Sequence, residues 1–216
     1  MTGAVILFAA GNKGGSGKTS TAHAIAHGLA LHGIRAFLIT TDERDLLPDS
    51  ERRYAILDGR TQDRLTDLLD RVAALEGVVV VIDGAARRPR IDDAISRIAT
   101  LTLIPFKQSE EDLVEARRDL DRLPDAVGLP NDWPTQAWAR RSADRELETT
   151  LMAYKARLMS PQPSINGYVR LLHRQGPAQP LNGPCRQLAL RVLDRAGLSL
   201  FDFREYAPKR RNAGAP

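Results

Sequence analysis

The feature that most constrains this chain is a glycine-rich loop between an apolar strand and a helix near the N-terminus. Residues 4–10 are a short, continuous apolar run, typical of a strand buried on both faces. The next nine residues, 11–19, read GNKGGSGKT. Apolar residues then recur at helical spacing from Ala22 to Ala30, and Gly33 can end that helix. A strand, a tight loop and a helix in this order predict the first unit of a parallel sheet covered by helices.

The residue types of this loop fit the chemistry of phosphate binding. Glycines allow backbone N–H groups to approach an anion where a side chain would block them. The ammonium of Lys18 would reach the β- and γ-phosphates of a nucleotide, and the hydroxyl of Thr19 would bind Mg²⁺. Asn12 stands where the general pattern has its first glycine. We expect the nucleotide to be bound by Gly14, Gly15, Ser16, Gly17, Lys18, Thr19 and Ser20.

The rest of the chain continues this alternation less clearly. We expect further strands at 36–39, 78–83 and 101–104, the last stopped by Pro105, and a final strand at 135–139. Residues 42–60 are polar and predicted to be irregular. Helices are expected after Thr61, at 91–97, after Ser109, through 147–158, near 167–174 and at 184–196. This predicts an α/β fold, a mainly parallel sheet with helices on both faces, as a single domain over 1–207 with a disordered basic tail at 208–216.

The charge of the chain is unevenly distributed. The net charge is +4, but residues 137–216 hold 14 Lys and Arg against six Asp and Glu. A basic last third predicts a polyanionic partner, nucleic acid or anionic lipid, and a solvated arginine-rich surface is the alternative interpretation. The single cysteine, Cys185, excludes an internal disulfide and a multi-thiolate metal site. No apolar run reaches about 18 residues, so we expect no transmembrane helix. The single cysteine fits a reducing setting, and we expect a cytoplasmic location.

The segment from Lys13 to Thr19 resembles the deviant Walker A motif of the ParA/MinD family of P-loop ATPases, and the chain looks most like short ParA-type partition proteins. The resemblance implies the P-loop NTPase type of fold, with ATP and Mg²⁺ as cofactors. In that family the lysine at the position of Lys13 reaches across a sandwich dimer to the partner's phosphates. Asp83 matches the aspartate that holds Mg²⁺ in the family, and Asp42 matches the carboxylate near the attacking water. The implied catalytic residues are therefore Lys13, Lys18 and Asp42, and the implied metal ligands are Thr19 and Asp83.

Two segments depart from the family pattern. Thr40 replaces the first aspartate of the family's Asp-x-Asp, and Glu43 with Arg44 replaces Pro-Gln. After Asp83, residues 84–86 read Gly-Ala-Ala where the family has Thr-Pro-Pro. The next two arginines, 87 and 88, could contact phosphate, a partner subunit, DNA or only solvent. We therefore expect slow ATP hydrolysis that a partner protein stimulates.

Among the branches of this family, the resemblance favours a ParA-type function. An ATP-dependent homodimer would bind DNA without sequence preference, remain nucleoid-associated and position a plasmid, a chromosome region or a large assembly. A ParB-like or cargo-adaptor protein would trigger hydrolysis. Iron–sulfur carriers need paired cysteines, and this chain has one. The last residues of the sequence do not have the pattern of the basic amphipathic helix with which MinD-type proteins bind membranes. The candidate DNA-contacting residues are Arg170, Arg174, Arg191 and Arg195.

Two alternatives stay open: a nucleotide-dependent interaction module in DNA transfer with little hydrolysis, and a MinD-like membrane-site regulator. The remaining distinctive residues are expected to be structural. His23 and His27 are four residues apart, the spacing of a metal-binding pair on a helix, but no third metal ligand is evident. They are therefore predicted to lie on the polar face of the first helix. Trp133 and Trp138 are expected to pack in the core, and Cys185 to be a small buried hydrophobic residue.

Overall fold

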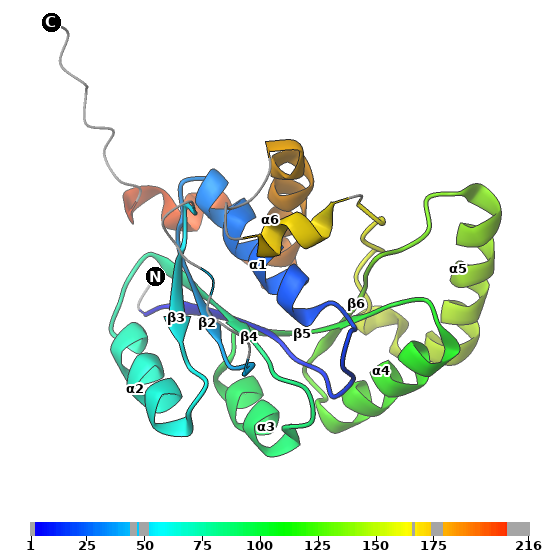
Figure 1. Cartoon of the computed structure of the whole chain (residues 1–216), viewed down its shortest axis with the longest axis horizontal. Coiled ribbons are helices and arrows are strands. Elements are labelled where there is room, and N and C mark those ends of the chain that lie inside the picture. The colour runs from blue at the N-terminus through cyan, green and yellow to red at the C-terminus, as the bar shows by residue number, and fades with distance from the viewer. Residues whose placement is uncertain (1–2, 44–46, 48–51, 166, 174–178, 207–216) are drawn as a thin grey trace, which may run out of the picture.

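The computed structural model describes residues 3–43, 47, 52–165, 167–173 and 179–206. Its centre is a six-stranded sheet in the order β3-β2-β4-β1-β5-β6, in which every pair of neighbouring strands is parallel (Figure 1). The strands are β1 (Val5–Ala9), β2 (Arg35–Thr40), β3 (Ala55–Asp58), β4 (Val78–Asp83), β5 (Leu101–Phe106) and β6 (Val127–Pro130). The expected tail at 208–216 lies outside the described residues.

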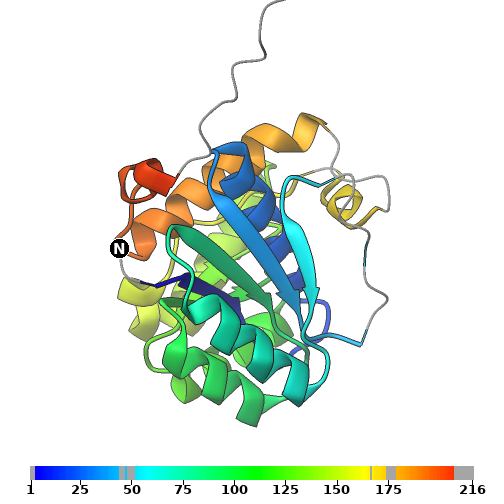
Figure 2. The same ribbon diagram turned by 90° about the vertical axis from the view of Figure 1, so that its left-hand side faces the viewer.

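Helices cover both faces of the sheet, as the sequence predicted (Figures 1 and 2). One face carries α1 (Lys18–Leu31), α6 (Asn182–Arg195) and the short 3-10 helix η2 (Tyr168–Leu172). The other carries α2 (Gln62–Ala73), α3 (Pro89–Ile98) and α4 (Glu110–Arg122), with α5 (Ala137–Leu151) packed on α4. Three further 3-10 helices are η1 (Met152–Arg157), η3 (Gln179–Leu181) and η4 (Leu200–Tyr206). In the part of the chain that is described, no helix combines the length and apolar character needed to cross a membrane.

The central strand β4 shows why the apolar runs of this sequence become sheet. All six of its residues are buried. Val79 and Val81 belong to the core beneath α1 and α6, whereas Val80 and Ile82 belong to the core on the opposite face. A strand covered on both faces must be apolar at every position, because successive side chains point to opposite sides.

A close contact between helices joins α1 to α6. Gly28 of α1 lies so close to α6 that a Cβ atom there would be 2.0 Å from the carbonyl oxygen of Cys185. Cys185 is fully buried, as predicted, and burial raises the pKa of its thiol to about 12. Glycine at position 28 therefore sets the spacing of the two helices that cover this face.

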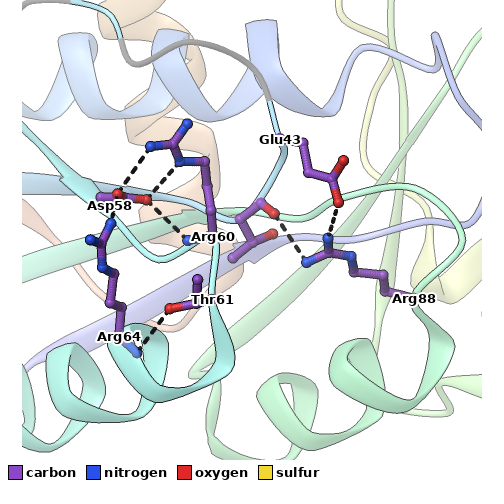
Figure 3. Close-up of polar contacts among 7 residues, drawn as sticks. Glu43, Asp58, Arg60, Thr61, Arg64 and Arg88 are labelled. Carbon is purple, nitrogen blue, oxygen red and sulfur yellow. Dashed lines mark hydrogen bonds and ion pairs between the residues drawn. The ribbon is translucent and has the colours of Figure 1, made fainter.

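The edge strand β3 ends in a carboxylate held by arginines (Figure 3). The Nε of Arg60 donates to Asp58 at 2.8 Å, and Arg64 of α2 forms a further ion pair with it. Hydrogen bonding by Arg60 lowers the pKa of Asp58 to about 2. Thr61 caps α2 by accepting a hydrogen bond from the backbone N–H of Arg64. These contacts fix the turn from β3 into α2.

Three predictions about strands were wrong. Residues 42–60, predicted to be irregular, contain β3, a four-residue edge strand with only partly buried side chains. The last strand is β6, not residues 135–139, where α5 begins instead. The strand β6 reads Val-Gly-Leu-Pro, and hydrogen bonds from residues 159 and 162 support it, which the local sequence could not show. Pro105 continues β5 because β1 has already ended opposite Leu103, so β5 pairs there with β6 alone.

Two predictions about single residues were also wrong. His23 and His27 lie on a buried face of α1, where they form hydrogen bonds with the hydroxyl of Tyr54 at 2.7 Å and with the amide of Asn182 at 2.8 Å. Among the described residues, no group of three His, Cys, Asp or Glu could hold a metal ion. Trp133 is buried as expected, but Trp138 is 69% exposed.

We predict that Gly28→Ala destabilises the protein by about 1–3 kcal/mol or more, because the added methyl group overpacks the contact between α1 and α6. Gly183→Ala on α6 is the matched control, since a Cβ at that position meets no atom within 4 Å. Alanine is the better helix former by about 1 kcal/mol, so the control should be neutral or stabilising. Chemical denaturation of both variants measures the effect, and equal stabilities would contradict the prediction.

Candidate nucleotide site

The candidate site lies at the carboxyl ends of the central strands. The register of β1 and β4 places Ala9 opposite Asp83, and the N–H of Gly84 donates to the carbonyl of Ala9 at 2.9 Å. The glycine-rich loop that follows β1 therefore begins beside Asp83. Asp83 itself is 1% exposed. The edge of an open parallel sheet where the connections leave for opposite faces is the usual place for a ligand crevice.

The loop reaches α1 through Gly17, whose backbone has a φ of 100°. A Cβ there would be strained and would lie 2.3 Å from the Nδ2 of Asn131, the residue that follows β6. Asn131 is 3% exposed and thus closes one side of the loop. Glycine at 17 permits both this contact and the turn that aims the N-terminus of α1 at the cavity. Such a helix N-terminus is a favourable environment for phosphate.

Lys18 is held inside the loop. Its Nζ donates to the carbonyl oxygen of Lys13 at 2.7 Å, and the residue is 6% exposed. Burial lowers the pKa of its ammonium, and attraction by Asp83 and Asp92 partly offsets this effect. The loop therefore keeps a buried positive charge where a phosphate chain would lie.

Lys13 contacts the N-terminus of α4 within the same chain. Its Nζ lies 3.2 Å from Glu111 and 3.3 Å from Asp112. Although partial burial acts to lower it, the net pKa of Lys13 is raised by hydrogen bonds and charge attraction from these two carboxylates. Ser109 caps the helix by accepting from the N–H of Asp112, as its capping-box pattern indicated. The acidic first turn of α4 thus stabilises Lys13 as a cation.

A cavity of about 380 Å³ opens above the loop. It brings together seven of the predicted residues, Gly14, Gly15, Gly17, Lys18, Thr19, Ser20 and Asp42. Ala86 of the altered loop after Asp83 also lines it, with five residues that the sequence did not indicate, Lys107, Asn131, Asp132, Tyr168 and Leu172. The side chain of Ser16 is not among them. Its hydroxyl is buried and has no hydrogen-bond partner among the described residues.

The residues beside this cavity fit a magnesium ion. Thr19 and Asp42 line the cavity, and Asp83 is buried close enough to Lys18 to affect its pKa. Hydroxyl and carboxylate oxygens are the protein ligands that Mg²⁺ uses, and the ion usually keeps waters and phosphate oxygens as well. When bound, the ion would neutralise charge on the phosphates. Thr19 and Asp83 are the residues that would hold it.

A buried acidic network supports the loop from α4. Asp119 accepts a hydrogen bond from the backbone N–H of Asn12 at 2.8 Å and another from Arg122 at 3.1 Å. Arg122 also lies 3.6 Å from Asp92, which is 1% exposed. Burial raises the pKa of Asp92 to about 6. The N–H of the residue that replaces the usual first glycine is therefore bound to a carboxylate of α4.

The sequence missed Asp119, although a signal was present. Asp119 lies seven residues after Asp112, between the apolar positions Ala116 and Leu120, so it falls on the buried face of α4. A carboxylate on such a face needs a partner, and the loop supplies it. The cavity residues after β5 and β6 and in η2 carried no comparable signal, because the fold alone brings those segments beside the loop.

The arginines predicted to contact DNA lie in different surroundings. Arg170 is exposed on η2. Arg191 of α6 donates to Gln162 at 3.0 Å and to the carbonyl of Ser160, and Arg195 donates to the carbonyl of Ala156 at 2.7 Å. Arg174 lies outside the described residues, and η2, which carries Arg170, ends at Leu172. Arg191 and Arg195 therefore also hold residues 156–162 against α6.

The six parallel strands, the loop after β1 and the carboxylate at the end of β4 define a fold of the P-loop NTPase type. Comparison with solved structures specifies it further. The fold is similar to that of a McdA variant from Cyanothece in complex with ATP, with a TM-score of 0.64 and 14% identity over 92% of this chain and 98% of that one. It is also similar to MinD from Aquifex aeolicus, with a TM-score of 0.65 and 16% identity over 88% and 97% of the two chains.

A Borrelia burgdorferi protein assigned to plasmid partition and bound to AMPPNP matches with a TM-score of 0.62 and 12% identity, over 88% of this chain and 99% of that one. The chain thus has the fold of the ParA/MinD type of P-loop ATPases, as the resemblance of its loop predicted. No family model matches the sequence, and no curated protein is significantly similar to it.

We predict that Asp119→Ala raises the Kd for ATP about tenfold, because the loop loses a carboxylate acceptor worth about 1.5–3 kcal/mol and must be ordered by the ligand instead. Asp125→Ala, at an exposed position just after α4, is the control. Titration calorimetry with Mg²⁺ and ATP measures both variants. Equal affinities for Asp119→Ala and wild type would contradict the supporting role of α4.

We also predict that Asp92 makes stability depend on pH. Since the pKa of Asp92 is about 6 in the folded protein and about 3.9 when unfolded, the folded state binds the proton more tightly. Proton binding by Asp92 therefore contributes to the free energy of unfolding below about pH 4, and this contribution is lost as the pH rises to about 6. Asp92→Asn should gain stability relative to wild type across this window, on the order of 2–3 kcal/mol. Denaturation curves at pH 4, 5, 6 and 7 test this, and a constant difference would contradict it.

Proposed function

We propose that this protein is a ParA-type ATPase that acts as a positioning switch. ATP and Mg²⁺ would drive formation of a sandwich homodimer, and the dimer would bind DNA without sequence preference. A ParB-like or cargo-adaptor protein would stimulate hydrolysis and release. The observation that carries the proposal is Lys13, a second lysine at a phosphate loop whose sheet matches McdA, MinD and a partition protein.

The cavity supports binding of ATP in particular. Similar solved structures hold ATP or its analogue AMPPNP. Here the loop offers backbone N–H groups, Lys18 offers a buried cation, and Thr19 offers a hydroxyl beside them. Asp42 lines the same cavity. In the proposed reaction Lys18 stabilises charge that develops on the phosphates, and Asp42 orients the attacking water.

Lys13 gives the proposed dimer its dependence on ATP. In the single chain its ammonium pairs with Glu111 and Asp112. To reach the nucleotide of a partner subunit it must leave these carboxylates, and only a stronger anion can compensate for their loss. A triphosphate supplies that anion, so the cation would cross the interface only when ATP is bound.

The basic last third of the chain supports binding to DNA. Arg170 is exposed, and Arg174, which lies outside the described residues, follows it closely in sequence. Arg191 and Arg195 already bond neighbouring backbone and side-chain oxygens, so we propose that they contribute less. Dimerisation would double the number of phosphate contacts and make binding depend on ATP. A nucleoid-associated location in the cytoplasm follows from this proposal.

Binding of a random-sequence DNA duplex at near-physiological salt tests the proposal. We expect wild type to bind with ATP and Mg²⁺, and at least tenfold more weakly with ADP or without nucleotide, because the monomer presents half of the phosphate contacts. Lys13→Ala should bind ATP but not gain affinity for DNA. Lys155→Ala, which changes an exposed lysine on η1, is the matched control.

The other outcomes separate the alternatives. Equal DNA binding in all nucleotide states would make the basic region a constitutive patch and contradict the switch. DNA binding gated by ATP without phosphate release, even with a stimulating partner, would favour the DNA-transfer module, which Thr40 and the altered loop after Asp83 motivate. ATP-dependent sedimentation with anionic liposomes in place of DNA would favour the MinD-like regulator.

A further inference from the structure

One guanidinium contacts both neighbours of Asp42. The Nη1 of Arg88 donates to the carbonyl oxygen of Thr41 at 3.3 Å. Its Nη2 donates to the Oε1 of Glu43 at 3.0 Å (Figure 3). Arg88 is the residue before α3, so its backbone is fixed by the start of that helix. Asp42, between the two contacted residues, lines the nucleotide cavity.

Thr41 is attached independently to the end of β4. It is 2% exposed, and both its N–H and its hydroxyl donate to the carbonyl of Asp83, at 3.1 and 2.8 Å. Its hydroxyl also accepts from the N–H of Ala85 at 3.0 Å. The backbone before Asp42 is therefore held by β4, whereas the side after Asp42 is held by the ion pair of Glu43 with Arg88.

We propose that Arg88 is a positioning residue for Asp42, clamping the segment after β2 onto the loop after β4 through Thr41 and Glu43. The proposal rests on the proposed ATPase function, in which Asp42 orients water. It also assigns a role to one of the two arginines left open by the sequence. Arg88 does not line the cavity, and its two terminal nitrogens are engaged with oxygens of the segment that it holds.

The clamp acts on geometry more than on global stability. Glu43 is 84% exposed, and exposed ion pairs contribute at most about 1 kcal/mol to folding. A misplacement of about 1 Å in a reacting group, however, can lower a rate as much as 100-fold. Arginine suits this role because its planar guanidinium donates to two acceptors at once. The compact ammonium group of a lysine reproduces this geometry poorly.

The experiment measures single-turnover hydrolysis of ATP with Mg²⁺, together with the Kd for ATP. We expect Arg88→Ala to lower the rate constant about tenfold with the Kd within about twofold of wild type, and Arg88→Lys to recover only part of the loss. Arg87→Ala is the matched control, because Arg87 is exposed and has the adjacent position in the same loop. It should match wild type in both measurements.

A double-mutant cycle shows whether Arg88 acts through Asp42. In an Asp42→Asn background, Arg88→Ala should lower the residual rate by less than twofold, because the group that it positions is already lost. The proposal would be overturned by a full tenfold loss of rate in the Asp42→Asn background. It would also be overturned if Arg88→Ala alone left the rate unchanged, or if it raised the Kd for ATP in parallel with the loss of rate. Thermal unfolding checks that each variant is folded. If Arg88→Ala is not folded, Arg88→Lys is used in its place.

Failure of the proposed function gives a distinct result. If wild type binds ATP but hydrolyses none, the ATPase proposal fails, and hydrogen exchange of the peptide containing residues 41–43 then decides the clamp. Faster exchange in Arg88→Ala than in Arg87→Ala would support the restraint on this segment. Equal exchange in the two variants would overturn it.

Discussion

The pairing of β1 with β4 is the constraint on which the rest of the site depends. Because Ala9 lies opposite Asp83, the glycine-rich loop and the carboxylate leave adjacent strands at the same level of the sheet. The N–H of Gly84, the residue after β4, donates to the carbonyl of Ala9 and continues the pairing past the end of β4. The two loops therefore start from a backbone that is buried and hydrogen-bonded. The strand pairing fixes the distance between the points where they start.

Around this pair of strands, α4 contributes more to the site than a covering helix needs to. Its first turn holds Lys13 through Glu111 and Asp112, and its buried face holds the N–H of Asn12 through Asp119. Arg122 connects the same helix to the start of α3. The loop is thus restrained along one side by carboxylates. This arrangement would make its conformation sensitive to any change in α4.

The predictable parts of the molecule are those whose signal is local. Three features carry short sequence patterns with one physical interpretation each: the glycine-rich loop, β4 and the capped start of α4. The structure confirms the predicted conformation of all three. The strands β3 and β6 were missed because each has only four residues, and partners distant in sequence stabilise them. The burial of His23 was missed for a related reason, since Tyr54, the residue before β3, supplies its hydrogen bond from a distant part of the chain.

The sequence by itself determined the fold class and the candidate phosphate site, because a buried strand, a glycine-rich turn and a helix with apolar residues at helical spacing constrain one another within about thirty residues. The resemblance of its motifs also implied roles for Asp42, which follows β2, and for Asp83, which ends β4. Only the tertiary structure decided which residues complete the cavity and that Arg88 contacts both neighbours of Asp42. Those contacts join segments from separate strands, and the distance between such segments is set by sheet order and helix packing, which no local pattern encodes.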